Sequence, residues 1–97
     1  MKVRWNPSAE YDLYDIHSFI AKDSRINADR FTELLIERAE SSGDEPRKHR
    51  KTPELDRDDV REVIEGNYRI IFQIHPREIE VIAVLHAGRL LRELPLR

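Results

Sequence analysis

The sequence predicts an α+β domain in which a helical hairpin packs on one face of a mostly antiparallel sheet. Apolar residues recur at helical spacing between residues 9 and 39, and their period changes to two after residue 60. The chain has 97 residues, which is enough for one hydrophobic core only. We therefore predict a single domain over residues 1–97, with elements in the order β-α-α-β-β-β.

The first half of the chain predicts a short strand and two helices. Residues 2–5 alternate polar and apolar, and Asn6-Pro7-Ser8 then begins a helix, because proline suits the first helical turn. Ser24 or Asn27 can cap a second helix, which Gly43 ends. The two apolar stripes are Ala9, Leu13, Ile16 and Ile20, followed by Ala28, Phe31, Leu34, Leu35 and Ala39. Because each stripe needs a buried partner, the two helices are expected to form a hairpin.

The second half predicts a loop and three strands. Residues 44–58 show no apolar pattern, whereas 60–65, 68–75 and 79–86 alternate and are separated by short turns. The final segment, 87–97, is either a short docked helix or an extended arm. With the helices on one face, we expect the other face of the sheet to stay at least partly open for function.

The turn at Pro76-Arg77 sets the expected register of the last two strands. A two-residue turn places Phe72 opposite Val81 and Tyr68 opposite Leu85, so that Arg69 and His86 share the open face. Arg61 joins that face if the loop at Glu65-Gly66-Asn67 has three residues, and it turns away if the loop has two. Arg89 is expected to overhang the same surface.

Arg69 and His86 each have a functional and a structural interpretation. A central-strand arginine must reach water, serve a site or pair with a carboxylate, for which Glu62, Glu65 and Glu80 are candidates. His86 can act as a general acid or base, or it can be a strand-end histidine that is hydrogen-bonded to the backbone.

The net charge of −2 conceals a segregation of charge. Residues 8–45 carry ten acidic and four basic side chains, whereas residues 46–97 carry nine acidic and eleven basic ones. The helical layer is therefore acidic, and the sheet and its loop are mildly basic. The basic loop residues Arg47, Lys48, Arg50 and Lys51 are candidates for contact with nucleic acid or another target, and the alternative is a solvated loop.

Composition excludes several classes of protein. The chain has no cysteine, which excludes disulfides, thiolate zinc sites and cysteine nucleophiles. Its four histidines show no ligand spacing, so we expect no metal and no cofactor. Secreted domains of this size usually carry disulfides, so the lack of cysteine favours a cytoplasmic protein. No apolar run is long enough to span a membrane, and the N-terminus lacks the apolar stretch of a signal peptide.

Several strings, in order, resemble the RelE/ParE toxin superfamily. They are Trp5-Asn6-Pro7-Ser8-Ala9-Glu10, Pro53-Glu54-Leu55, Val60-Arg61-Glu62-Val63, Tyr68-Arg69-Ile70-Ile71-Phe72 and the closing stretch 81–91. The resemblance implies the toxin of a type II toxin–antitoxin pair, held inactive by a cognate antitoxin in a hetero-oligomer. RelE-like members cleave mRNA in the ribosomal A site, whereas ParE-like members inhibit DNA gyrase.

The residues favour the ParE-like branch. Metal-free RNA cleavage needs a general acid or base and cations at the phosphate, and the candidates for these roles are Arg69, His86, Arg61 and Arg89. The lysine-rich strand of RelE-like members is replaced by residues 60–65, whose glutamates repel phosphate. A nuclease, or a degenerate module that only binds an antitoxin, remains the alternative, so whether the chain is an enzyme depends on the branch.

The acidic hairpin and its groove to the sheet are expected to receive the antitoxin, because an open sheet leaves a strand edge exposed there. The predicted contact residues are Leu13, Ile16, Ile20, Phe31 and Leu35.

Overall fold

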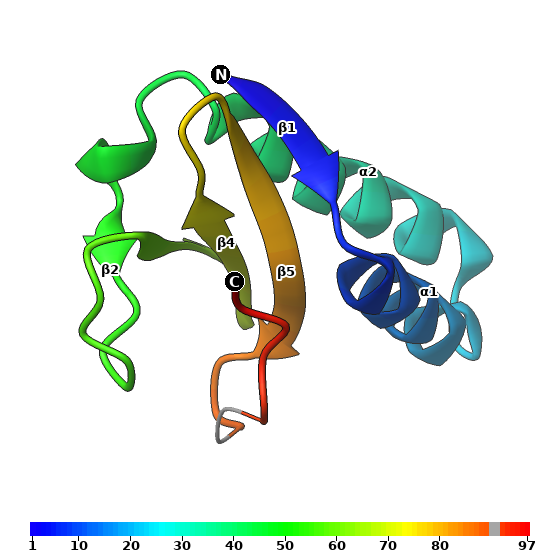
Figure 1. Cartoon of the computed structure of the whole chain (residues 1–97). Helices are drawn as coiled ribbons and strands as arrows, with labels where there is room; N and C mark the ends of the chain where they lie inside the picture. The colour runs from blue at the N-terminus through cyan, green and yellow to red at the C-terminus, as the bar shows by residue number, and fades with distance from the viewer. Residues whose placement is uncertain (90–91) are drawn as a thin grey trace.

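The computed structural model describes residues 1–89 and 92–97 and has the predicted α+β architecture (Figure 1). Its elements are β1 (Lys2–Trp5), α1 (Pro7–Ala21), α2 (Arg25–Ser41), the 3₁₀ helix η1 (Pro46–Lys48), β2 (Arg50–Lys51), β3 (Val60–Glu65), β4 (Tyr68–Ile74) and β5 (Glu78–His86). The predicted order of elements is confirmed, and β2 and η1 are added within the loop.

The five strands form one sheet in the order β1-β5-β4-β3-β2. β1 runs parallel to β5, and the other neighbours are antiparallel. The α1–α2 hairpin packs on one face of this sheet (Figure 1). No helix in the part of the chain that the structure describes is long and apolar enough to cross a membrane.

Both helices begin where the sequence predicts. The side chain of Asn6 accepts a hydrogen bond from the Ser8 amide at 2.9 Å, with Pro7 in the first turn, and Ser24 accepts one from the Asn27 amide at 3.2 Å. Gly43 follows the end of α2, where an added Cβ would lie 2.5 Å from the Met1 carbonyl oxygen. A side chain at position 43 would therefore force α2 and β1 apart.

Apolar side chains pack on both faces of the sheet. The helix-side core joins Ala9, Ile16, Leu35 and Ala39 to Val63, Ile70, Phe72, Ile74, Ile79, Val81 and Val84. The second core holds Val60, Ile71, Ile82, Ala83 and Leu85. Leu55 of the loop and Leu94 and Leu96 of the tail pack against this second core. The prediction of an open face is therefore largely wrong, because an extended C-terminal arm and a loop bury that face.

A β-bulge in β5 changes the predicted register. Phe72 lies opposite Val81 as predicted, but Ile71 then lies opposite Ala83 and Tyr68 opposite His86. One extra residue in a strand reverses the facing of every residue beyond it. His86 consequently lies on the Tyr68 side of the sheet, and the prediction that it shares a face with Arg69 is wrong.

The loop between β3 and β4 has two residues, because Glu65 pairs with Tyr68. Gly66 adopts φ +58°, a conformation that suits glycine in such a turn. Val63 therefore faces the helices, and Arg61 lies opposite Phe72, away from Arg69. The two-residue loop is therefore the alternative that is observed, and it separates Arg61 from Arg69.

Candidate functional site

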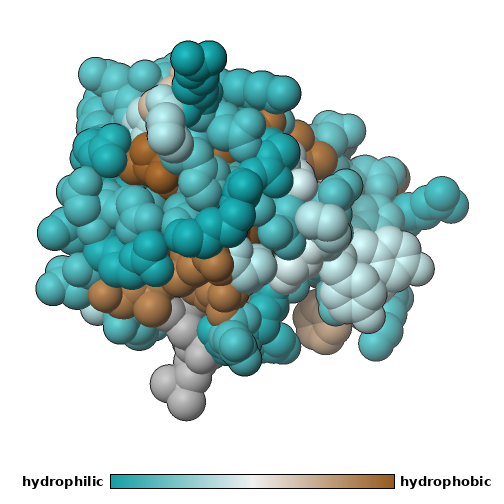
Figure 2. Space-filling model, viewed as in Figure 1, coloured by the Kyte–Doolittle hydropathy of each residue, from teal (hydrophilic) through white to brown (hydrophobic). Residues whose placement is uncertain are grey.

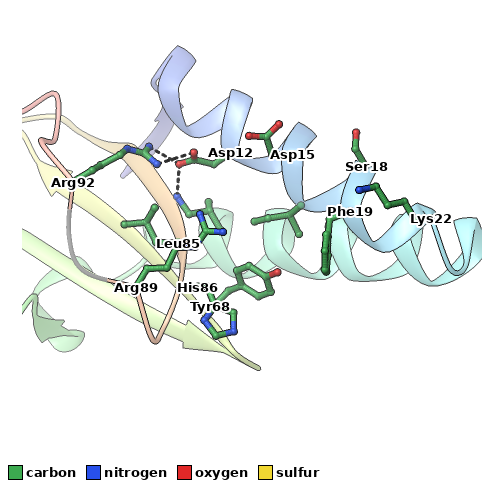
Figure 3. A pocket seen from close by; sticks show the side chains of 12 residues that line it. Asp12, Asp15, Ser18, Phe19, Lys22, Tyr68, Leu85, His86, Arg89 and Arg92 are labelled. Carbon is green, nitrogen blue, oxygen red and sulfur yellow. Dashed lines mark hydrogen bonds and ion pairs between the residues drawn. The ribbon is translucent and has the colours of Figure 1, made fainter.

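A cleft of about 560 Å³ lies between α1 and the end of β5 (Figure 3). Helix α1 contributes Phe19, and Lys22 follows the end of this helix. The sheet contributes Tyr68 and His86, and the turn after β5 contributes Arg89. The cleft exists because the bulge in β5 turns His86 toward the helix side and Tyr68 lies directly opposite it. His86 and Arg89, two of the predicted site residues, are thus brought together here.

His86 is held in a defined orientation at the cleft. Its ring meets the Tyr68 ring edge-on, with the centroids 5.5 Å apart and the planes at 80°. The Gly88 amide donates a hydrogen bond to His86 Nδ1 at 3.2 Å. Because Nδ1 accepts, the neutral imidazole carries its proton on Nε2, where it can be donated to a bound partner.

Asp12 joins three parts of the chain at one wall of the cleft (Figure 3). Its buried carboxylate accepts a hydrogen bond from the Val84 amide at 2.9 Å and is bound by both terminal nitrogens of Arg92, at 3.0 and 2.7 Å. Arg92 also donates to Ser8. Sequence reasoning did not select Asp12. The signal that could have found it is its place three residues after Ala9, beside the apolar stripe, where a carboxylate indicates a buried ion pair.

Arg69 lies on the opposite face of the sheet and is 4% exposed. Its terminal nitrogens donate to both oxygens of Glu54 at 2.7 Å, and it also binds Glu62 Oε1 at 2.7 Å. The hydrogen bonds to Glu54, opposed by burial and reinforced by Glu62, raise the pKa of Arg69. Of the three candidate partners, Glu62 is therefore the one used, and Arg69 is fully engaged.

Arg61 anchors the basic loop. Its guanidinium donates to the carbonyl oxygens of Arg47 at 3.0 Å and His49 at 2.9 Å, and to the carboxylate of Asp58 at 2.6 Å. Each of these bonds holds loop backbone or a loop carboxylate against β3. The four candidates for phosphodiester cleavage are therefore divided between three places: the buried pair at Arg69, the loop anchor at Arg61, and the cleft that holds His86 and Arg89.

The basic loop is largely neutralised by carboxylates. Arg47 binds Asp58 at 3.1 Å, and Lys48 lies 3.8 Å from Glu45. Arg50 donates to Glu62 at 2.8 Å. These pairs lower the positive potential that the loop presents, although its side chains remain accessible. The role of Arg47, Lys48, Arg50 and Lys51 in contacting a target stays a prediction.

The residues predicted to contact an antitoxin lie in the core or against it. Leu35 is fully buried and Ile16 is 7% exposed. Leu13, Ile20 and Phe31 are partly buried and pack on the same cluster. Helical periodicity identifies the apolar residues that a helix buries within its own domain. The five residues were chosen by that periodicity, and their side chains accordingly pack toward the core. Leu35 is therefore a core position and Ile16 also lines the cleft, and the role of these five residues in antitoxin contact stays a prediction.

The exposed apolar side chains of the hairpin are different residues. Tyr11, Tyr14 and Phe19 on α1 are 66%, 69% and 66% exposed, and Ile26 at the start of α2 is 65% exposed. Figure 2 shows weakly polar surface gathered over α1, at the right of the view. Among the described residues, no group of three or more His, Cys, Asp or Glu side chains is placed to hold a metal ion.

The fold and the cleft define a class of small α+β domain, in which a helical hairpin covers one face of a five-stranded sheet and leaves a cleft beside its first helix. A chain of the chromosomal ParDE TA system from P. aeruginosa has a similar fold, with a TM-score of 0.75 and 15% identity, over 91% of this chain and 97% of that one. No curated protein sequence matches.

A family model described as the ParE toxin of the type II toxin–antitoxin system, parDE, matches residues 3–91. The chain therefore belongs to the ParE toxin family. The ParE-like branch of the resemblance is confirmed.

Proposed function

We propose that this chain is the toxin of a type II toxin–antitoxin pair, that it inhibits DNA gyrase, and that a cognate antitoxin neutralises it in the cytoplasm. The family supports the toxin role. The choice of target rests on one observation, namely that the four residues of the nuclease alternative do not converge. A stoichiometric inhibitor that binds its target needs no such convergence.

Cleavage of RNA requires a proton-transferring group and cations at the same phosphate. His86 and Arg89 share the cleft, but Arg69 is buried with two carboxylates on the other face and Arg61 holds the loop. Moving Arg69 to the cleft would leave the buried Glu62 carboxylate without one of its two partners, and moving Arg61 would release the carbonyl oxygens of Arg47 and His49. This cost favours an inhibitor that acts by binding.

The purified toxin is expected to abolish supercoiling of relaxed plasmid by gyrase, and addition of antitoxin is expected to restore it. Mapping of mRNA ends after expression should show intact transcripts. A-site cleavage with normal supercoiling would support the nuclease instead, and loss of that cleavage in His86→Ala would then assign His86. A chain that binds antitoxin but shows neither activity would be a degenerate module.

We further propose that the antitoxin docks on the exposed aromatic side chains of α1 and the adjoining cleft. Tyr11, Tyr14 and Phe19 offer large apolar area that solvent contacts in the isolated chain. Phe19 also lines the cleft, beside Lys22 and Arg89. A partner segment can therefore bury an aromatic contact and meet positive charge at the same place.

Phe19→Ala is expected to weaken antitoxin binding by about tenfold, because central aromatic contacts dominate interface energies. Isothermal titration calorimetry with the purified pair measures this change. Ile26→Ala is the matched control, since Ile26 is equally exposed but lies on α2. Equal affinities for the wild type and Phe19→Ala would place the antitoxin elsewhere on the toxin.

A further inference from the structure

A second hollow, lined mainly by basic side chains, lies at the end of the sheet where β4 turns into β5. It has a volume of about 520 Å³ and is lined by Arg4, His75, Pro76, Arg77, Glu78 and Arg97. We call this the basic hollow. The β4–β5 turn and the N-terminus lie close together at the top of Figure 1. Figure 2 shows hydrophilic side chains projecting at that end.

A buried carboxylate holds two of these arginines in place. Glu80 is 2% exposed, and it accepts hydrogen bonds from Asn6 at 2.8 Å and from Arg97 at 2.9 Å. Arg4 lies 3.3 Å from the same carboxylate and donates through Nε to Glu78. The guanidinium groups of Arg4 and Arg97 are therefore positioned before any ligand arrives, which lowers the entropy cost of binding one.

The basic hollow keeps an excess of positive charge. Lys2, Arg4, Arg77 and Arg97 lie near two carboxylates, Glu78 and Glu80. Arg77 is exposed and makes no ion pair within residues 1–89 and 92–97. In the basic loop both Arg47 and Arg50 are bound to carboxylates, and at the hollow Arg4 and Arg97 are bound in the same way, so that Arg77 is the arginine of the hollow that keeps free donors. Guanidinium donors that are available to a ligand are thus found at this hollow.

We propose that the basic hollow binds a phosphate group. A guanidinium presents paired N–H donors that match two phosphate oxygens, and the partly exposed arginines around it add charge at short range. Arg77 supplies the free donors, while Arg4 and Arg97 supply fixed positive charge. The phosphate belongs either to a nucleic-acid backbone or to a small phosphorylated molecule, and both present the same anionic oxygens.

Two titrations test this site and distinguish the two sources. In the first, inorganic phosphate is added to ¹⁵N-labelled toxin while the amide resonances of His75, Arg77 and Glu78 are followed. In the second, a labelled 20-base-pair duplex is titrated by fluorescence anisotropy at several salt concentrations. Arg77→Ala is compared with Arg30→Ala, which removes another exposed arginine, on α2, that makes no ion pair within the described residues.

If the hollow binds nucleic acid, phosphate is expected to shift these amide resonances. Arg77→Ala is then expected to weaken DNA binding by about tenfold and to reduce the slope of log affinity against log salt concentration by about one. Arg30→Ala leaves both unchanged. Amide shifts with phosphate but no binding of DNA support the site and assign it to a small phosphorylated ligand. The proposal is overturned if phosphate leaves the amides of His75, Arg77 and Glu78 unshifted, or if Arg30→Ala weakens DNA binding as much as Arg77→Ala. The proposal does not rest on gyrase inhibition, because neither titration contains gyrase.

Discussion

Arg69→Ala is expected to lower the free energy of unfolding by about 3 kcal/mol or more, because it leaves a buried charge without its main partner. The Glu62 side chain is fully buried between Arg69 and Arg50, and the Arg50 side chain is 57% exposed. Removal of Arg69 leaves Glu62 with only this solvent-exposed partner. Urea denaturation followed by circular dichroism measures the loss.

The double variant Arg69→Met/Glu62→Leu separates the buried charge from simple loss of packing. Replacing a buried ion pair by apolar residues of similar size is often nearly neutral, so this protein is expected to regain most of the stability. Arg30→Ala should change the free energy of unfolding by less than about 0.5 kcal/mol. Wild-type stability in Arg69→Ala would show that the contacts of Arg69 contribute nothing to the fold.

Glu80 is expected to make the protein acid-sensitive. Burial alone would raise the pKa of Glu80, but hydrogen bonds from Asn6, His75 and Arg97 and the charge of Arg4 lower it to about 2. Because the folded pKa lies below the usual value of 4.5, the carboxylate stabilises the fold above pH 4.5, and this contribution is lost as the pH falls toward 2. The difference corresponds to about 3 kcal/mol.

Glu80→Gln should therefore be about 3 kcal/mol less stable than wild type at pH 7, and the two curves should converge as the pH falls toward 2. Denaturant midpoints between pH 7 and pH 2 give both curves. Other carboxyl groups with lowered pKa values are present in both proteins, namely Glu54, Asp58, Asp59 and Glu78. These groups affect both stability curves alike, so the difference between the curves reports on Glu80. Glu37→Gln, an exposed substitution, is the control, and a pH-independent gap at Glu80→Gln would contradict the assignment.

The order of elements was predictable because local signals carry it. Asn6 and Ser24 cap the helices, and the change of hydrophobic period separates the hairpin from the sheet. The register of β4 and β5 was predictable only near its turn, where Phe72 meets Val81. Beyond that pair, an extra residue in β5 shifts the register. No glycine or proline in residues 79–86 marks the position of this bulge.

The candidate site was only partly predictable for the same reason. His86 and Arg89 were selected by residue type, and they do share a cleft. Arg69 and Arg61 were selected by the same argument, but folding supplies each with carboxylates or carbonyls that lie far away in the sequence or around a loop. Neither Asp12 with Arg92 nor the basic hollow could be found from spacing, because their members come from opposite ends of the chain.

The amino-acid sequence alone was sufficient for the α+β class, the helical hairpin, the segregation of charge and the resemblance to ParE-like toxins, since periodicity, capping and motif order are local properties. Three features depend instead on one bulge and on long-range contacts. They are the side of the sheet on which His86 lies, the burial of the second sheet face and the pairing of each arginine. Only the tertiary structure could decide these, because a strand's side chains change face with each single-residue shift and an ion pair forms wherever the chain brings opposite charges together.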